Sequence, residues 1–173
     1  MMRMVLIFAF FLPFIALAQS VDSRGYIVKV GDKLPTIEFT DLNGVNYTNQ
    51  SLKDQVVVLQ FTASWCSVCR KEMPHLEEEV WQRFKNDNFL LLGLDLKEEA
   101  SVVREFAKKM GVTYPMVSDL DGALFEKFAG PKQGVTRNIV VNQEGEIIFL
   151  TRLYDREEFE EMIDVIDSAL KGK

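Results

Sequence analysis

The sequence predicts an α/β fold in which helices flank a central mixed sheet, with helices on both faces. Short apolar runs typical of buried strands alternate with segments of helical period, and an Asn-Gln-Glu-Gly turn joins two late strands. The 173 residues suffice for roughly one domain. The formal net charge of -6 disfavours nucleic-acid binding, because the chain has no excess of basic side chains to attract phosphates.

The N-terminus has the pattern of a secretory signal peptide. Arg3 precedes an apolar run that ends in an Ala-x-Ala frame, so we expect residues 1–18 to be cleaved after Ala18. The remaining single domain, residues 19–173, would then work in the periplasm, where disulfides persist. The alternative is an uncleaved segment that holds the protein at the outer face of the membrane. However, the run is shorter than the roughly 20 residues that span a bilayer, and Pro13 interrupts it.

The first half of the domain predicts a hairpin followed by a β-helix-β unit. Residues 36–39 and 45–47 flank an Asp-Leu-Asn-Gly turn, which indicates the hairpin. Residues 56–61 form a nearly continuous apolar run, typical of a strand buried on both faces. Apolar residues then recur every three or four positions from 69 to 84, as in a helix, before a second apolar run at 89–94. The two strands should therefore be parallel.

The second half predicts further helices and strands. A helical stripe at 102–110 ends at Gly111, a residue suited to a helix C-cap. A short strand at 114–117 and a helix at 121–129 should follow.

The C-terminal part predicts a hairpin and a last helix. Strands at 139–141 and 147–150 flank the Asn-Gln-Glu-Gly turn, and apolar residues from 159 to 170 share one helical face. We find no repeat or linker, which favours a single domain and, by default, a monomer.

Two cysteines, Cys66 and Cys69, carry the clearest chemical signal. They lie where the buried strand ends and the helix begins, one turn apart, which is close enough to form a disulfide. The helix N-terminus should stabilise the Cys66 thiolate and lower its pKa, whereas Cys69 lies on the apolar face and should be harder to ionise. We therefore expect Cys66 to attack a substrate disulfide and Cys69 to resolve the mixed disulfide.

Two other interpretations of the pair are weaker. A closed zinc site needs four ligands, and besides carboxylates only His75 remains, so we expect no metal and no cofactor. A purely structural disulfide is also disfavoured, since so short a loop removes little entropy from the unfolded chain.

The sequence resembles the TlpA/ResA-type thioredoxin-like proteins of bacteria. The resemblance rests on Phe-Thr-Ala-Ser-Trp-Cys-Ser-Val-Cys at 61–69, on Pro74, and on Gly-Val-Thr-Arg-Asn-Ile-Val-Val-Asn at 134–142. It implies a thioredoxin-like fold with an N-terminal β-hairpin extension at 32–52 and an inserted helix-strand segment at 96–118.

The resemblance also implies a function. Proteins of this type are extracytoplasmic thiol:disulfide oxidoreductases that often reduce partner proteins, such as apocytochromes c during cytochrome c maturation. A membrane thiol carrier recharges them. The implied partners here are protein disulfides or dithiols and such a carrier.

The chain departs from the family pattern at Thr136, where the family usually has a cis-proline. A cis bond before threonine costs about 2.5–4 kcal/mol, against about 0.5–1 kcal/mol before proline, so the sequence leaves cis or trans open. We expect Val135 and Thr136 to bind substrate, through backbone groups that face an extended strand. Trp65, beside Cys66, should shield the disulfide and contact partners.

The resemblance assigns an acid to the second cysteine. The family places a glutamate at the start of the inserted segment, and Glu98 matches it. Its expected role is to take the proton from Cys69. The alternative is that Glu98 and its neighbour Glu99 only complement the helix dipole.

Other functional classes fit less well. Peroxidases of the same fold have threonine or serine three residues before a lone cysteine, where this chain has Ala63. A copper-binding module of the fold has Cys-x-x-x-Cys and a distal histidine, which this chain lacks. A redox-inactive module is the remaining alternative.

Overall fold

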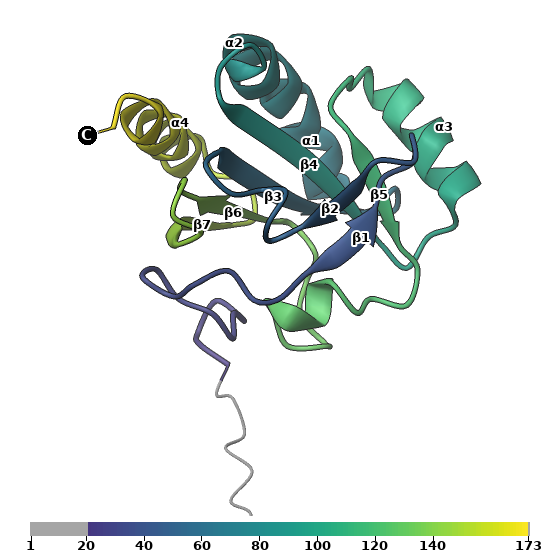
Figure 1. The fold of residues 1–173 in the computed structure, drawn as a ribbon. Coiled ribbons are helices and arrows are strands. Elements are labelled where there is room, and N and C mark those ends of the chain that lie inside the picture. Colours follow the sequence, from purple (N-terminus) through teal and green to yellow (C-terminus); the bar gives the residue numbers. More distant parts are fainter. Residues whose placement is uncertain (1–20, 173) are drawn as a thin grey trace, which may run out of the picture.

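The computed structural model describes residues 21–172 (Figure 1). The expected signal peptide, residues 1–18, lies outside the described residues. None of the helices in residues 21–172 combines the length and the apolar character that a membrane-spanning helix needs.

A five-stranded mixed sheet forms the centre of the molecule, in the order β5-β4-β3-β6-β7. The strands are β3 (Val56–Thr62), β4 (Phe89–Leu96), β5 (Met116–Asp119), β6 (Arg137–Val141) and β7 (Ile147–Arg152). β3, β4 and β5 run parallel, whereas β6 and β7 are antiparallel to their neighbours. This arrangement confirms the predicted fold class, including the β-helix-β unit and the late hairpin.

The central position of β3 in the sheet accounts for its nearly continuous apolar sequence. Every residue of β3 is buried, because β4 and β6 flank it and side chains cover both of its faces. The chain then enters α1 (Ser67–His75), continues through a π-helical turn η1 (Leu76–Trp81), and ends in α2 (Gln82–Phe84). Pro74 lies inside α1 and has no N–H to donate, and the π-helical turn follows it within two residues.

The long helices cover one face of the sheet. α1, α3 (Ala100–Met110) and α4 (Arg156–Leu170) pack their apolar residues there in one core cluster. Figure 1 shows these helices together on one side of the sheet and the N-terminal segment on the other. α3 ends at Gly111 with φ of 70°, as predicted for a C-cap, and the Asp155 side chain caps α4.

The other face of the sheet carries no long helix in the described part of the chain, so the expectation of helices on both faces is wrong. The N-terminal segment and the hairpin of β1 (Glu38–Thr40) and β2 (Asn46–Thr48) cover it, together with a short 3-10 helix η2 (Phe125–Lys127).

The helix predicted at 121–129 is thus reduced to the single turn η2. Asp119 explains the difference, because its carboxylate accepts hydrogen bonds from the backbone N–H groups of Leu124 and Phe125. Gly122, with φ of 78°, also turns the chain just before this point. These side-chain bonds compete with a regular helix start.

Candidate active site

Cys66 and Cys69 form a disulfide at the N-terminus of α1, as the sequence predicts. Their Cα atoms are 5.3 Å apart. Cys66 is the N-cap of the helix, and its Sγ accepts a hydrogen bond from the Cys69 N–H at 3.1 Å. Cys66 is 8% exposed and Cys69 is 0% exposed, so Cys66 is the sulfur nearer to solvent.

Thr136 contacts both sulfurs from the loop before β6. Its Oγ1 lies 3.1 Å from the Cys66 Sγ and 3.2 Å from the Cys69 Sγ. No cis peptide bond occurs among the described residues, so the bond before Thr136 is trans. The Thr136 carbonyl already accepts a hydrogen bond from Leu153 N–H, whereas the Val135 backbone groups make no such bond to the described backbone.

Arg137 fastens this loop to the N-terminal segment, whereas its sequence position just past the loop suggests either a partner contact or a solvated loop residue. It is fully buried, with its guanidinium 4.4 Å from the centre of the Tyr26 ring. Its Nε donates to the Gly134 carbonyl at 3.2 Å and its Nη1 donates to the Arg24 carbonyl at 2.9 Å. Arg137 therefore links the loop that carries Thr136 to the N-terminal segment.

Glu98 lies beside the segment that precedes Cys66. Its carboxylate accepts two hydrogen bonds from Ser64, one from the backbone N–H and one from the hydroxyl, both at 2.6 Å. On the other side, Arg70 donates to the Ser64 carbonyl at 2.6 Å. Among the described residues, no hydrogen bond joins Glu98 to Cys69. The Glu98 carboxylate therefore contacts the loop before the cysteines.

Glu72 is a second acid that the sequence interpretation missed. It lies on α1, one turn after Cys69, and is 1% exposed. Its Oε1 accepts a hydrogen bond from Asn138 at 2.7 Å, and its Oε2 has no partner among the described residues. Burial raises its pKa to about 7. The signal in the sequence is a glutamate three residues after Cys69, on the side of the helix that faces the sheet.

A buried polar cluster surrounds Glu72 on the sheet. Asn138 also donates to Thr151 Oγ1 at 3.0 Å, and the Tyr114 hydroxyl donates to Gln60 Oε1 at 2.8 Å. The hydrogen bond from Asn138 favours the charged form of Glu72, against the larger effect of burial. A carboxyl group in this environment can change its protonation state near neutral pH.

The remaining predicted site residues differ in exposure. Trp65 is 62% exposed beside the disulfide, whereas Val135 is 3% exposed. An exposed indole next to a reactive cysteine offers an apolar contact surface.

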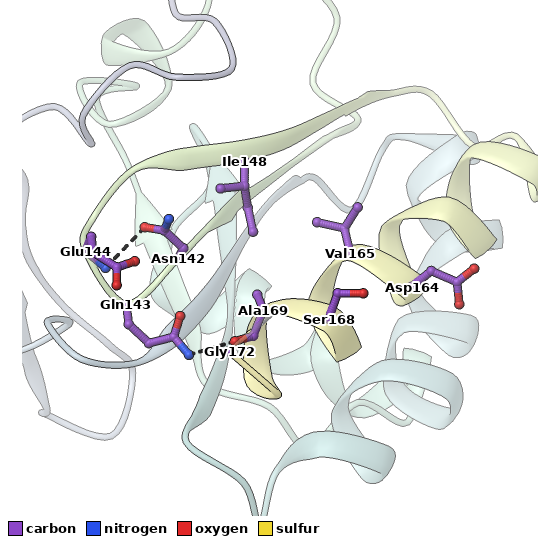
Figure 2. A pocket seen from close by; sticks show the side chains of 9 residues that line it. All are labelled: Asn142, Gln143, Glu144, Ile148, Asp164, Val165, Ser168, Ala169 and Gly172. Carbon is purple, nitrogen blue, oxygen red and sulfur yellow. Dashed lines mark hydrogen bonds between the residues drawn. The ribbon is translucent and has the colours of Figure 1, made fainter.

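A cavity of about 540 Å³ lies elsewhere, between the β6–β7 turn and the end of α4 (Figure 2). Figure 2 shows Gln143 reaching across to the backbone of Ala169, a hydrogen bond of 3.0 Å. The sheet register pairs Val57 with Val141 at this end and Phe61 with Arg137 near Cys66. The cavity is therefore at the opposite end of the sheet from the disulfide. Among the described residues, no group of three histidine, cysteine or acidic side chains could hold a metal ion.

Comparison with known sequences gives one family and several relatives. The sequence pattern described as the AhpC/TSA family matches residues 30–150. A thiol-disulfide oxidoreductase ResA from Bacillus cereus is 28% identical over 112 residues, which cover 65% of this chain and 64% of that protein. The chain thus spans slightly less than two thirds of that relative. The ResA of Geobacillus kaustophilus is 26% identical over 141 residues, 80% of this chain and 79% of that one.

Solved structures agree with this result. A protein from Bacteroides thetaiotaomicron, described as a proposed protein disulfide isomerase, is 46% identical. It superimposes with a TM-score of 0.82 over 85% of this chain and 93% of its own. A proposed thiol:disulfide interchange protein DsbE from Chlorobium tepidum is 19% identical, with a TM-score of 0.70 over 83% of this chain and 99% of its own, and supports the fold alone. The expected resemblance to thioredoxin-like thiol-disulfide oxidoreductases is confirmed.

Proposed function

Because the chain belongs to the AhpC/TSA family, with thiol-disulfide oxidoreductases among its relatives, we propose that it exchanges thiols and disulfides with other proteins through Cys66 and Cys69. One observation carries the proposal. The two sulfurs lie at the N-terminus of α1, and a single hydroxyl, that of Thr136, contacts both. Such a site can stabilise a thiolate on Cys66 and keep the second sulfur one turn away.

The reaction proceeds in two exchanges. The Cys66 thiolate attacks one sulfur of a substrate disulfide, so that a mixed disulfide forms and the other substrate sulfur leaves as a thiolate. Cys69 then loses its proton and attacks the Cys66 sulfur, which releases the second substrate thiolate and forms the Cys66–Cys69 disulfide. Two electrons have passed to the substrate, and a dithiol donor must return them before the next cycle.

Glu72 is our candidate acceptor for the Cys69 proton. It lies one helical turn from Cys69, is buried, and has a pKa of about 7, so it can take up a proton near neutral pH. Glu98 was the acid expected for this role. Since both of its oxygens accept hydrogen bonds from Ser64, we assign it instead to holding the loop before Cys66.

We propose that the substrates are disulfides in extended protein segments. Trp65 would contact the substrate side chain. The Val135 backbone groups, which make no hydrogen bond to the described backbone, would pair with the substrate main chain. By analogy with the TlpA/ResA type, we also propose a periplasmic monomer, released by signal-peptide cleavage or held by an uncleaved segment. It would reduce partners such as apocytochromes c and be recharged by a membrane thiol carrier.

The test is to cycle the pair in purified protein. The reduced protein should reduce a model protein disulfide, Cys69→Ser should trap a mixed disulfide on Cys66, and Cys66→Ser should be inert. Equilibration in thiol buffers then gives the reduction potential of the pair, which decides the direction of the exchange. A potential near the roughly -270 mV of thioredoxin indicates a reductant, and one near the roughly -120 mV of DsbA indicates an oxidant. A pair that cannot be cycled would overturn the proposal. Peroxide turnover, or retention of Cu(I) after desalting, would favour the two alternative classes.

A further inference from the structure

Leu153 combines an unfavourable backbone conformation with an exposed apolar side chain. It lies in the short turn between β7 and α4 with φ of 67°, in the left-handed region that suits glycine or asparagine and is an outlier for a bulky residue. Its side chain is 48% exposed and belongs to neither core cluster. Among the non-glycine residues of the described chain that have positive φ, Leu153 is the apolar one, and the others are Asp54 and Lys97.

The residues on either side of Leu153 hold its backbone in this conformation. The Arg152 N–H donates to the Glu158 carboxylate at 3.2 Å, and the Tyr154 ring stacks on His75 with ring centres 5.3 Å apart. Leucine in this turn is therefore strained, and its side chain gains little burial in return. Strained residues concentrate at functional sites, so the exposed side chain points to a contact with another molecule.

Thr136 connects Leu153 with the disulfide. Its carbonyl accepts a hydrogen bond from the Leu153 N–H at 3.1 Å, and its hydroxyl lies 3.1 Å and 3.2 Å from the two sulfurs. Trp65, the residue before Cys66, supplies a second exposed apolar side chain. A substrate cysteine that reaches Cys66 brings its chain neighbours with it, each about 3.3 Å further along an extended segment. Those neighbours then lie within reach of the exposed side chains beside the disulfide.

We propose that Leu153 is a specificity-determining residue, whose side chain contacts an apolar side chain next to the reacting cysteine of the substrate. The preferred substrate is then a disulfide whose cysteine stands beside leucine or a similar apolar residue in an extended segment. Binding removes the apolar surface of both side chains from water, which favours this substrate over one with polar neighbours. The inference rests on the proposed function, which it extends by naming the substrate class.

The experiment measures how fast the reduced protein reduces three disulfides. The probes are a disulfide-linked dimer of the capped peptide Gly-Leu-Cys-Leu-Gly, the same dimer with serine in place of leucine, and oxidised glutathione. Wild type should reduce the leucine peptide about fivefold faster than the serine peptide, as expected for one partly exposed apolar contact. Leu153→Asn should reduce both peptides at equal rates, within about twofold, and keep the wild-type rate on the serine peptide and on glutathione. Leu153→Met retains an apolar side chain and should keep the preference.

Stability provides a second readout. Asparagine tolerates the left-handed conformation, so the equilibrium constant for unfolding of Leu153→Asn should be about fivefold smaller than that of wild type in urea titrations. A loss of specificity together with a gain in stability distinguishes a substrate contact from a folding defect.

Val45→Asn is the matched control for an exposed apolar residue. Val45 is 49% exposed, and its backbone exchanges hydrogen bonds with Asp41 in the β1–β2 hairpin. Asp54→Gly is the control for a strained backbone, since Asp54 has φ of 66° just before β3, at the end of that strand opposite the cysteines. Both variants should keep the preference for the leucine peptide.

Several outcomes would contradict the inference. They are equal wild-type rates on the two peptides, a preference that survives in Leu153→Asn, and an equal loss on all three disulfides, which would make Leu153 a structural residue. A wild-type dimer that Leu153→Asn converts to a monomer would show that a second copy of the chain covers Leu153 instead. If Leu153→Asn does not fold, Leu153→Gly carries the same test. Reduction of none of the three disulfides by wild type would overturn the proposed function and this inference with it.

Discussion

At the scale of single residues, Thr136 shows how a side chain can replace a family feature. The family usually has proline against the disulfide, whereas here a hydroxyl lies within 3.2 Å of both sulfurs. After reduction that hydroxyl can donate to the Cys66 thiolate, and hydrogen bonds to charged groups contribute about 1.5–3 kcal/mol. Thr136 therefore adds polar stabilisation that a proline ring lacks.

Thr136→Val should slow the reaction of reduced Cys66 with iodoacetamide at pH 7 by about tenfold, because the thiolate loses a donor of roughly 1.5 kcal/mol. Thr136→Ser keeps the hydroxyl and should react within about twofold of wild type. Alkylation followed by mass spectrometry measures both. Equal rates in all three proteins would show that the hydroxyl does not stabilise the thiolate.

Glu72→Gln should slow resolution of the mixed disulfide and change its pH dependence. The carboxylate accepts a proton only when ionised, so the wild-type rate should rise as the pH passes about 7, the pKa of Glu72. The glutamine variant should lose this rise and be slower by about 100-fold at high pH, the lower range for a lost general base. Stopped-flow release of a fluorescent thiol from Cys66 measures the rate. An unchanged profile would exclude Glu72 as the acceptor.

At the scale of elements, the helix ends and the strands could be predicted, and one helix could not. Gly111 ends α3 as expected from its sequence position, and β3 is buried along its whole length as its apolar run indicates. The helix at 121–129 fails because a side chain from outside it, that of Asp119, binds the backbone donors. Apolar spacing alone does not reveal such competition.

Gly111→Ala should lower the free energy of unfolding by about 1 kcal/mol, since alanine at φ of 70° is strained. The effect is conformational because a Cβ at this position would meet nothing within 4 Å. Urea unfolding measures the change, with Lys109→Ala on the same helix turn as the control. A stability equal to wild type would mean that the helix end adapts.

In the candidate site, too, features set by local sequence could be predicted, whereas contacts between distant segments could not. The cysteine pair, Trp65 and Thr136 are close to one another in sequence or on the expected strand edge, so spacing and the family resemblance found them. Glu72 escaped because a charged residue between apolar positions looks solvated until the fold shows it facing Asn138. The contact of Glu98 with Ser64 spans 34 residues, and only the folded sheet brings these two residues together.

At the scale of the whole molecule, two buried acids make stability depend on pH. The pKa of Glu72 is raised from 4.5 to about 7, and that of Asp95 from 3.8 to about 8. In the intervening range the folded protein retains protons that the unfolded chain has lost. The free energy of unfolding therefore decreases as the pH rises.

We expect the protein to be more stable at pH 5 than at pH 8, with the loss starting near the unfolded pKa values and complete once both folded groups have ionised. The double variant Glu72→Gln with Asp95→Asn should show a flatter pH dependence. Urea titrations at both pH values measure the difference. If the free energy of unfolding changed equally with pH in wild type and in the double variant, ionisable groups other than Glu72 and Asp95 would cause the pH dependence.

The exposed position of Trp65 gives the protein an optical signal for its own redox state. The chain has two tryptophans, and the other, Trp81, donates its indole N–H to Thr113 on the helix side. A disulfide quenches the fluorescence of a neighbouring indole, so emission from Trp65 should increase when the Cys66–Cys69 bond is reduced, while that from Trp81 stays constant. With Trp81→Phe, the turnover of the site can be followed in real time without any added label.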